Sequence, residues 1–283
     1  MATHRHSDRL ILVTGATGKQ GGAALRHLHA RGFPVRALTR DLEKAEVRGL
    51  AGEGVEVVRG DFGDPDSIRR AMDGVGGVYS VQPSHTGHEV EEGKMLADMA
   101  LRYDVGHFVY SSVGSADRNT GIPHFETKYE IENHVRQLGI RYTIIRPVFF
   151  MDNWLWQKDS LHNGVLAQPL SPERKLQMIF SDDIGAFVAL AFEHPDHWRD
   201  RAFDLAGDEK SMNDLAAEFG RKLGREVRYV QVPWDEFEKQ AGHEYALMYR
   251  WFEDRGYTAD IAAARTEYGR LHTFEHWLNE TVI

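Results

Sequence analysis

Short apolar runs alternate with stretches of helical periodicity along the first 150 residues. Runs of Val, Ile and Leu bounded by turn residues are typical of buried strands. Six such runs lie at residues 10–13, 35–39, 55–58, 77–81, 108–110 and 142–145. Between them, amphipathic segments predict helices at residues 18–31, 41–50, 64–72, 89–103 and 124–138. Because parallel strands need crossover connections, and helices supply them, the alternation predicts an α/β fold with a Rossmann-type, doubly wound parallel sheet.

After Pro147 this rhythm breaks. Helices are predicted at residues 149–161, 181–192, 211–223, 245–252 and 273–278, and short strands at residues 176–180, 203–205 and 227–232. No repeat, low-complexity tract or linker separates this half from the first. We therefore predict a Rossmann domain at residues 1–150 and a smaller C-terminal α/β lobe at residues 151–283, packed on the first domain and free to interleave with it.

The charge balance and the residue types exclude several classes of protein. With 34 Lys and Arg against 43 Asp and Glu, the formal net charge is −9 and no basic cluster stands out. We therefore expect no direct nucleic-acid binding. No apolar stretch approaches the roughly 18 residues of a membrane helix, so we expect no membrane association. The absence of cysteine excludes disulfides and zinc–thiolate sites. Together these features predict a cytoplasmic protein. His85 and His88 have no third ligand at motif spacing, so no metal is expected.

A glycine-rich loop follows the first predicted strand and opens the first predicted helix. It reads Thr14-Gly15-Ala16-Thr17-Gly18-Lys19-Gln20-Gly21-Gly22. In this context Gly15 permits a tight turn, Gly18 lets the backbone approach a diphosphate, and Gly21 lets the helix pack on the strand. The helix N-terminus and its dipole then favour an anion. We therefore predict that this loop, with Thr17, Lys19 and Gln20, binds the diphosphate of a dinucleotide.

The end of the second predicted strand indicates which dinucleotide is bound. Sites for NAD place Asp or Glu there to accept a hydrogen bond from the ribose 2′-OH, whereas this chain has Arg40. A guanidinium can hold a 2′-phosphate through two hydrogen bonds, and Lys44, one helical turn further on, can add a second positive charge. The alternative is that Arg40 is a solvated surface residue. The expected cofactor is NADP(H).

Residues that follow the later strands complete the expected cofactor site. Asp61 and Phe62 follow the third strand, where Phe62 is expected to line the adenine pocket. Asp61 either accepts a hydrogen bond from the adenine N6 amine or is a plain turn residue. Gln82 after the fourth strand and Pro147 after the sixth are expected beside the nicotinamide, because ligands bind at the carboxyl ends of parallel strands.

Lys128 lies on the apolar face of the predicted helix at residues 124–138. That face contains Ile131, Val135 and Leu138, and Lys128 precedes Ile131 by one helical turn. A buried ammonium is costly without an anionic partner, which a nicotinamide ribose or a substrate would help to orient. The alternative is that Lys128 extends past the core to water. His124 shares this face and is a candidate proton donor, because histidine titrates near neutral pH; a structural or exposed histidine is an equal alternative.

Further short motifs accompany the glycine loop and Arg40 along nearly the whole chain. They are Gly60-Asp61, Tyr110-Ser111, His124-Phe125-x-x-Lys128, Arg146-Pro147, Phe150-x-x-Asn153, Ser181-Asp182-Asp183-Ile184-Gly185 and Thr273-x-x-x-Trp277-Leu278. In this order they resemble the NmrA-like family of the atypical short-chain dehydrogenase/reductase superfamily. The resemblance implies a Rossmann domain with a small lobe, and the nicotinamide in the cleft between them. Members include NADP-sensing regulators that bind partner proteins, and reductases that act on quinones or aromatic ethers.

The chain departs from ordinary short-chain dehydrogenases at one position. Those enzymes use Tyr-x-x-x-Lys, in which the lysine lowers the pKa of the tyrosine so that its phenol exchanges a proton with the substrate carbonyl. Lys128 matches the lysine, but His124 occupies the position of the tyrosine. Ser111 and Ser112 fall where the superfamily has a helper hydroxyl, or else they cap the strand end. The resemblance thus implies Lys128, His124 and Ser112 as the catalytic candidates.

Two functions stay open on these grounds. The first is an NADPH-dependent reductase of a quinone or another conjugated small molecule bound between the lobes, an acceptor that needs little acid catalysis. The second is a non-catalytic NADP(H)-sensing regulator that binds a protein partner, which the missing tyrosine favours. We favour the reductase, and a homodimer is compatible with either function.

Overall fold

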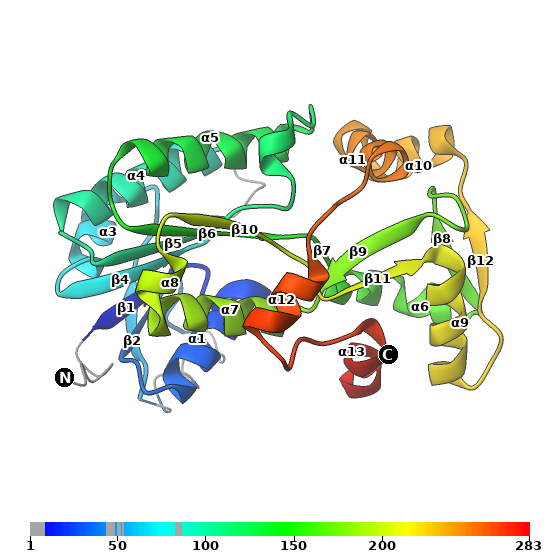
Figure 1. Ribbon diagram of the computed structural model, residues 1–283, viewed down its shortest axis with the longest axis horizontal. Helices are drawn as coiled ribbons and strands as arrows, with labels where there is room; N and C mark the ends of the chain where they lie inside the picture. Colours follow the sequence, from blue (N-terminus) through cyan, green and yellow to red (C-terminus); the bar gives the residue numbers. More distant parts are fainter. Residues whose placement is uncertain (1–8, 44–48, 50–51, 53, 83–86) are drawn as a thin grey trace.

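The computed structural model describes residues 9–43, 49, 52, 54–82 and 87–283. Two lobes lie side by side along its longest axis (Figure 1). The larger lobe contains a seven-stranded sheet in the order β10-β6-β5-β4-β1-β2-β3, with every neighbouring pair parallel. Its strands are β1 Leu10–Val13, β2 Val35–Thr39, β3 Glu56–Arg59, β4 Val75–Ser80, β5 His107–Ser111, β6 Tyr142–Pro147 and β10 Arg201–Leu205. The predicted α/β fold with a doubly wound parallel sheet is confirmed.

Helices cover both faces of this sheet. The upper face in Figure 1 carries α3 (Pro65–Ala71), α4 (Glu89–Arg102) and α5 (Pro123–Gln137). The lower face carries α1 (Lys19–Ala30), α7 (Ser181–Glu193) and α8 (Pro195–Trp198), and the short 3-10 helix η2 (Ala116–Arg118) precedes α5. Helices α1 and α7 approach closely because Gly185 has no side chain: a Cβ there would lie 2.4 Å from the carbonyl carbon of Ala23.

The second lobe contains two small sheets and most of the later helices. One sheet has the order β11-β9-β7, and the other pairs β12 with β8. These strands are β7 Phe149–Phe150, β8 Val165–Gln168, β9 Lys175–Ile179, β11 Asp208–Ser211 and β12 Arg228–Gln231. The remaining helical segments are η3 Met151–Gln157, α6 Lys158–His162, α9 Met212–Leu223, α10 Trp234–Ala241, α11 His243–Asp254, α12 Ile261–Glu267 and α13 Phe274–Glu280.

One hydrophobic core joins the two lobes. It runs from Ile11 and Leu25 under the main sheet, through Phe187 of α7, to Trp154 and Phe219 in the second lobe. A separate core lies between the sheet and α3, α4 and α5. Strand β10 comes from beyond residue 150, yet it pairs with β6 as an edge strand of the main sheet. The division at residue 150 stays a prediction, with α7, α8 and β10 interleaved into the first domain.

The local pattern of residues was misleading at several points after Pro147. The predicted helix at residues 149–161 begins instead with β7, in which Phe149 pairs with Met178 of β9, and continues as the 3-10 helix η3 before α6. Strand β11 was not predicted because its sequence, Asp-Glu-Lys-Ser, has no apolar residue, and only its pairing with β9 makes it a strand. β8, α8, α10 and α12 were also missed.

Two further predictions concern the described residues only in part. The predicted helix at residues 41–50 lies mostly outside them. Within the described part of the chain, no helix combines the length and hydrophobicity that crossing a bilayer requires.

Candidate functional site

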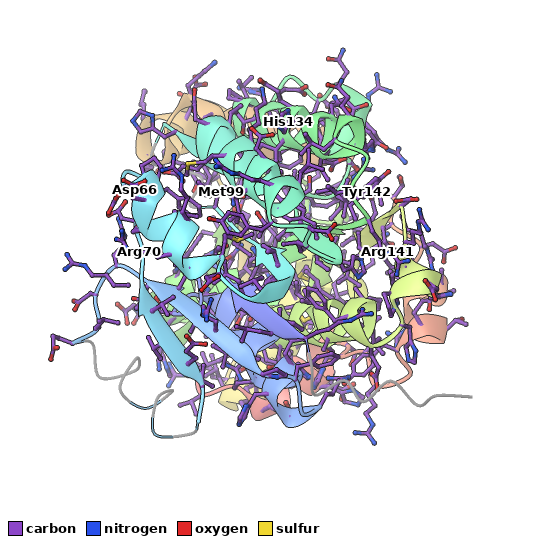
Figure 2. The ribbon with its side chains drawn as sticks, turned by 90° about the vertical axis from the view of Figure 1, so that its left-hand side faces the viewer. Asp66, Arg70, Met99, His134, Arg141 and Tyr142 are labelled. Carbon is purple, nitrogen blue, oxygen red and sulfur yellow. The ribbon has the colours of Figure 1, made fainter. Side chains whose placement is uncertain are left out.

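A cavity of about 730 Å³ opens at the carboxyl ends of β1, β2, β3 and β4. Strand β1 lies between β4 and β2 in the sheet, and doubly wound sheets bind ligands where the order of the strands reverses in this way. The volume lies within the range of small-molecule sites, roughly 300–1,000 Å³. The opposite edge of the main sheet faces the viewer in Figure 2, where strands begin, for example β6 at Tyr142, just after Arg141.

Most of the predicted cofactor residues line this cavity. They are Gly15, Thr17, Gly18, Lys19, Gln20, Gly21, Arg40, Asp61, Phe62 and Gln82. Lys128 and Pro147 do not line it, and Lys44 and His85 lie outside the described residues. The lining also includes residues that were not predicted, namely Leu38, Thr39, Asp41, Gly60, Val81, Glu92 and Phe150. Glu92 gives no signal in the sequence, because only the position of α4 brings it to the cavity, whereas Phe150 is part of a motif noted above.

The loop between β1 and α1 has a backbone suited to a diphosphate. Gly15 has a φ of +60°, in the region that glycine adopts readily. A Cβ at Gly21 would lie 2.1 Å from the carbonyl oxygen of Gly15, so no side chain fits there. Helix α1 begins at Lys19, with Gly18 as an N-cap that has no side chain to bind the first amides. The amide groups at the start of the helix are therefore available to an anion.

The loop is held against the neighbouring strands by side-chain hydrogen bonds. Thr14 Oγ1 donates to the Val81 carbonyl at 2.9 Å and accepts from the Val81 amide at 2.7 Å. Ser111 Oγ donates to Gln20 Oε1 at 2.7 Å. The loop is thus fixed to the ends of β4 and β5 by hydrogen bonds within the protein.

Charged side chains gather at the end of the cavity formed by β2, β3 and α4. Arg40 is exposed, and no carboxylate of the described residues forms an ion pair with it. Asp61 Oδ1 accepts a hydrogen bond from the Gly63 amide at 2.9 Å, so Asp61 stabilises a turn. Burial raises the pKa of the Glu92 carboxyl, against the opposing effect of His88 and Arg40. Glu92 Oε2 is buried without a hydrogen-bond partner in the described structure.

Gln82, which follows β4, also lines the cavity. Gln82 Nε2 donates to Ser80 Oγ at 2.8 Å. Its Oε1 is buried and has no donor among the described residues. A buried acceptor without a donor costs free energy, and the carboxamide N–H of a nicotinamide would supply one. The glycine cradle, the exposed Arg40 and the buried Gln82 Oε1 together fit a phosphorylated dinucleotide.

The three predicted catalytic side chains are all bound to carboxylates of the protein. Lys128 Nζ donates to Glu89 Oε1, and the two side chains are only 13% and 5% exposed. His124 Nδ1 lies 2.6 Å from Glu244 Oε1 of α11. Ser112 Oγ donates to Glu132 Oε1 at 2.5 Å. The anionic partner that a buried Lys128 requires is therefore supplied by α4.

Ser112 belongs to a buried ionic network between α5 and β6. Glu132 is fully buried and accepts hydrogen bonds from Arg146 Nε at 2.9 Å and Arg146 Nη2 at 2.7 Å. Arg146 Nη1 also donates to Asp117 at 2.7 Å. Burial by itself lowers the pKa of Arg146, but these hydrogen bonds raise it overall, so the guanidinium stays charged. The hydroxyl of Ser112 thus points into a permanently charged network.

Comparisons with known proteins agree with this architecture. A model of the NmrA-like family matches residues 7–278. An NAD(P)H azoreductase of Xenophilus azovorans is 32% identical over 234 residues, which cover 82% of this chain and 80% of that protein.

Two solved structures extend the comparison to three dimensions. The triphenylmethane reductase of Citrobacter sp., complexed with NADP(H), superposes with a TM-score of 0.84 at 21% identity over 97% of this chain and all of that one. NmrA, a negative transcriptional regulator in complex with NADP, gives a TM-score of 0.84 at 23% identity, covering 98% of this chain and 96% of that one. Both likenesses establish a shared fold.

Proposed function

The chain belongs to the NmrA-like family, and we propose that it is an NADPH-dependent reductase of a quinone or another conjugated small molecule. NADP(H) is its cofactor. The observation that carries this proposal is the preformed cavity, in which a glycine cradle for a diphosphate stands next to Arg40, a cation with no carboxylate partner among the described residues. Such a guanidinium matches a 2′-phosphate in charge and geometry.

The nature of the acceptor is inferred from two relatives and from the surroundings of α5. The relatives are named for the reduction of azo and triphenylmethane compounds, which are conjugated. Bound NADPH supplies a hydride, and a conjugated acceptor spreads the resulting charge, so that a strong general acid is not needed. This agrees with an α5 helix on which Lys128 and His124 are each held by a glutamate.

A second candidate function rests on the same observation. If Lys128, His124 and Ser112 serve only the protein's own structure, the chain binds NADP(H) without reducing anything. Its occupancy would then change the affinity for a protein partner, through a coupling that acts equally in both directions. The likeness to a negative transcriptional regulator in complex with NADP supports this alternative.

The experiment that tests the proposal has two stages. Fluorescence titration of the full chain with NADPH and NADH is expected to give markedly tighter binding of NADPH. Consumption of NADPH is then followed with panels of quinones, azo compounds and enones, with Gly18→Val, a variant whose side chain would occupy the place of the diphosphate, as the control without cofactor. Turnover above the control supports the reductase. Tight NADPH binding with no acceptor reduced would favour the sensor, and absence of NADPH binding would contradict both.

A further inference from the structure

Trp156 is an indole of the second lobe that lies against the nucleotide loop. It is 73% exposed. The ammonium of Lys19 lies 5.6 Å from the centre of its ring and donates to the Asp152 carbonyl at 3.4 Å. Lys19 begins α1 and lines the cavity, whereas Trp156 and Asp152 belong to η3. The contact therefore bridges the two lobes at the edge of the cavity.

The segment that carries Trp156 is firmly anchored. Two residues earlier, Trp154 is buried, and its Nε1 donates to Met178 Sδ at 3.1 Å. The carboxylate of Asp152 accepts from the Ser181 amide at 3.1 Å and from Ser181 Oγ at 3.0 Å. Gln157 Oε1 accepts from the Ala167 amide at 3.0 Å. The exposure of Trp156 is thus not the result of a loose segment, because a fixed helical turn presents the indole to solvent.

Lys19 is a cation that forms no ion pair with any of the residues that the structure describes. Its ammonium contacts a carbonyl oxygen and a ring face. A diphosphate bound at the start of α1 would bring negative charge to this ammonium. A cation placed between phosphate oxygens and an aromatic face gains from both, and more so as water is excluded.

We propose that Lys19 and Trp156 form a clasp, a contact between the two lobes that lies across the diphosphate of the bound cofactor. Through this contact the second lobe slows the release of the cofactor from the first. The proposal rests on the proposed NADP(H) binding and adds to it a residue that slows release. A bound diphosphate would pair with the Lys19 ammonium, and the indole of Trp156 would cover that ammonium on one side and shield it from water. The structure already shows the Lys19–Trp156 contact, so only its strengthening as water is excluded slows dissociation, by between about threefold and thirtyfold.

The test measures the dissociation rate of NADPH from the full chain, by stopped-flow displacement with excess NADP. Trp156→Leu is expected to raise that rate by between about threefold and thirtyfold, and to leave the association rate within about twofold. Trp156→Phe keeps an aromatic face and is expected to restore most of the retention. Lys19→Met is expected to raise the rate as well, and the double variant to add little to it, because both residues act through one contact.

The chain offers a matched control. The Arg250 guanidinium lies 4.7 Å from the ring centre of Trp234, a second cation–π pair between α10 and α11 that does not line the cavity. Trp234→Leu removes an indole from that pair, and NADPH release from this variant is expected to match the wild type.

Two results would overturn the clasp. The first is NADPH release from Trp156→Leu at the wild-type rate; if the KM for a planar acceptor is raised at the same time, Trp156 contacts the acceptor instead. The second is equal acceleration in Trp156→Leu and Trp156→Phe, which would assign the effect to packing. If the wild-type chain fails to bind NADPH at all, the proposed function falls, whereas binding with identical release from all variants removes only the clasp.

Discussion

The cavity wall and the α5 helix differ in how their polar groups are satisfied. In the wall, Arg40 has no carboxylate partner, and Glu92 Oε2 and Gln82 Oε1 are buried without a hydrogen bond, as far as the described residues extend. On and beside α5, in contrast, Lys128 and Ser112 are each bound to a buried glutamate. The polar groups of the wall are left to be paired by a ligand, whereas the polar groups on and beside α5 are already paired within the protein. The binding site is therefore preformed. Any reaction that uses Lys128 or Ser112 would involve groups that also stabilise the fold.

Gly21→Val is the change with the largest expected effect, because it removes the preformed wall. Any Cβ at this position would lie 2.1 Å from the Gly15 carbonyl oxygen and 2.8 Å from that of Thr14, so the loop or the start of α1 has to move. NADPH binding, measured by fluorescence titration, is expected to be lost. Gly269→Ala is the control, since nothing lies within 4 Å of a Cβ there. Wild-type affinity in Gly21→Val would show that the cradle plays no part in binding.

Lys128→Met tests whether α5 is only structural. The substitution leaves the carboxylate of Glu89 buried without its partner, and we expect a loss of about 3 kcal/mol in the free energy of unfolding, measured with urea. Adding Glu89→Gln removes that charge, so most of the stability is expected to return. If turnover returns with it, Lys128 has no part in the reaction. If stability returns and turnover does not, the Lys128 ammonium acts on the reacting groups. In that case α5 takes part in the function of the site as the cavity wall does.

Arg40→Ala tests whether the wall of the cavity recognises the 2′-phosphate of NADPH. Loss of a charge-assisted contact is expected to weaken NADPH binding by about 1–3 kcal/mol and to leave NADH binding nearly unchanged. Both affinities are measured by calorimetric titration, and Arg102→Ala, at an exposed arginine at the end of α4, serves as the control. Equal losses for both cofactors would mean that Arg40 does not recognise the 2′-phosphate.

Glu92→Gln is expected to give the smallest effect, a few-fold gain in NADPH affinity at neutral pH. The ionised carboxylate repels the phosphates, and the substitution removes that charge. Since burial raises the pKa of Glu92, lowering the pH protonates it earlier than an ordinary glutamate. The ratio of the wild-type Kd to that of Glu92→Gln should therefore fall toward one as the pH decreases from 7 to 5. A ratio that is independent of pH would show that the charge of Glu92 does not act on the bound cofactor.

The parts of the site that the sequence predicted are those set by local signals. The glycine loop and Arg40 each adjoin a strand whose end is visible in the pattern of apolar residues, and they line the cavity. The partner of Lys128 escaped prediction because it depends on how α4 packs beside α5, over a separation of more than 30 residues. Glu92 escaped because it reaches the cavity only through the position of α4. A periodic pattern states which face of a helix is buried but not which helix covers it.

The same limit applies to the fold. The six strands of the first half were recognisable because each is apolar and followed by a helix. The position of β10 at the edge of the sheet, beside β6, follows from the path of the chain through the second lobe and from the close contact of α1 with α7 at Gly185. Neither residue type nor spacing near Phe203 states which strand will be its neighbour.

The late arrival of β10 has a consequence during synthesis. The ribosome releases the first six strands well before residues 201–205, so β6 emerges with one edge unpaired. An open edge is a template for strands of other chains, and domains of a growing chain otherwise fold as soon as they are released. During synthesis the exposed edge is therefore the largely buried strand β6, and in the finished protein it is the less buried strand β10. The exposed edge passes from one strand to the other only when the segment that goes through the second lobe has returned to the sheet.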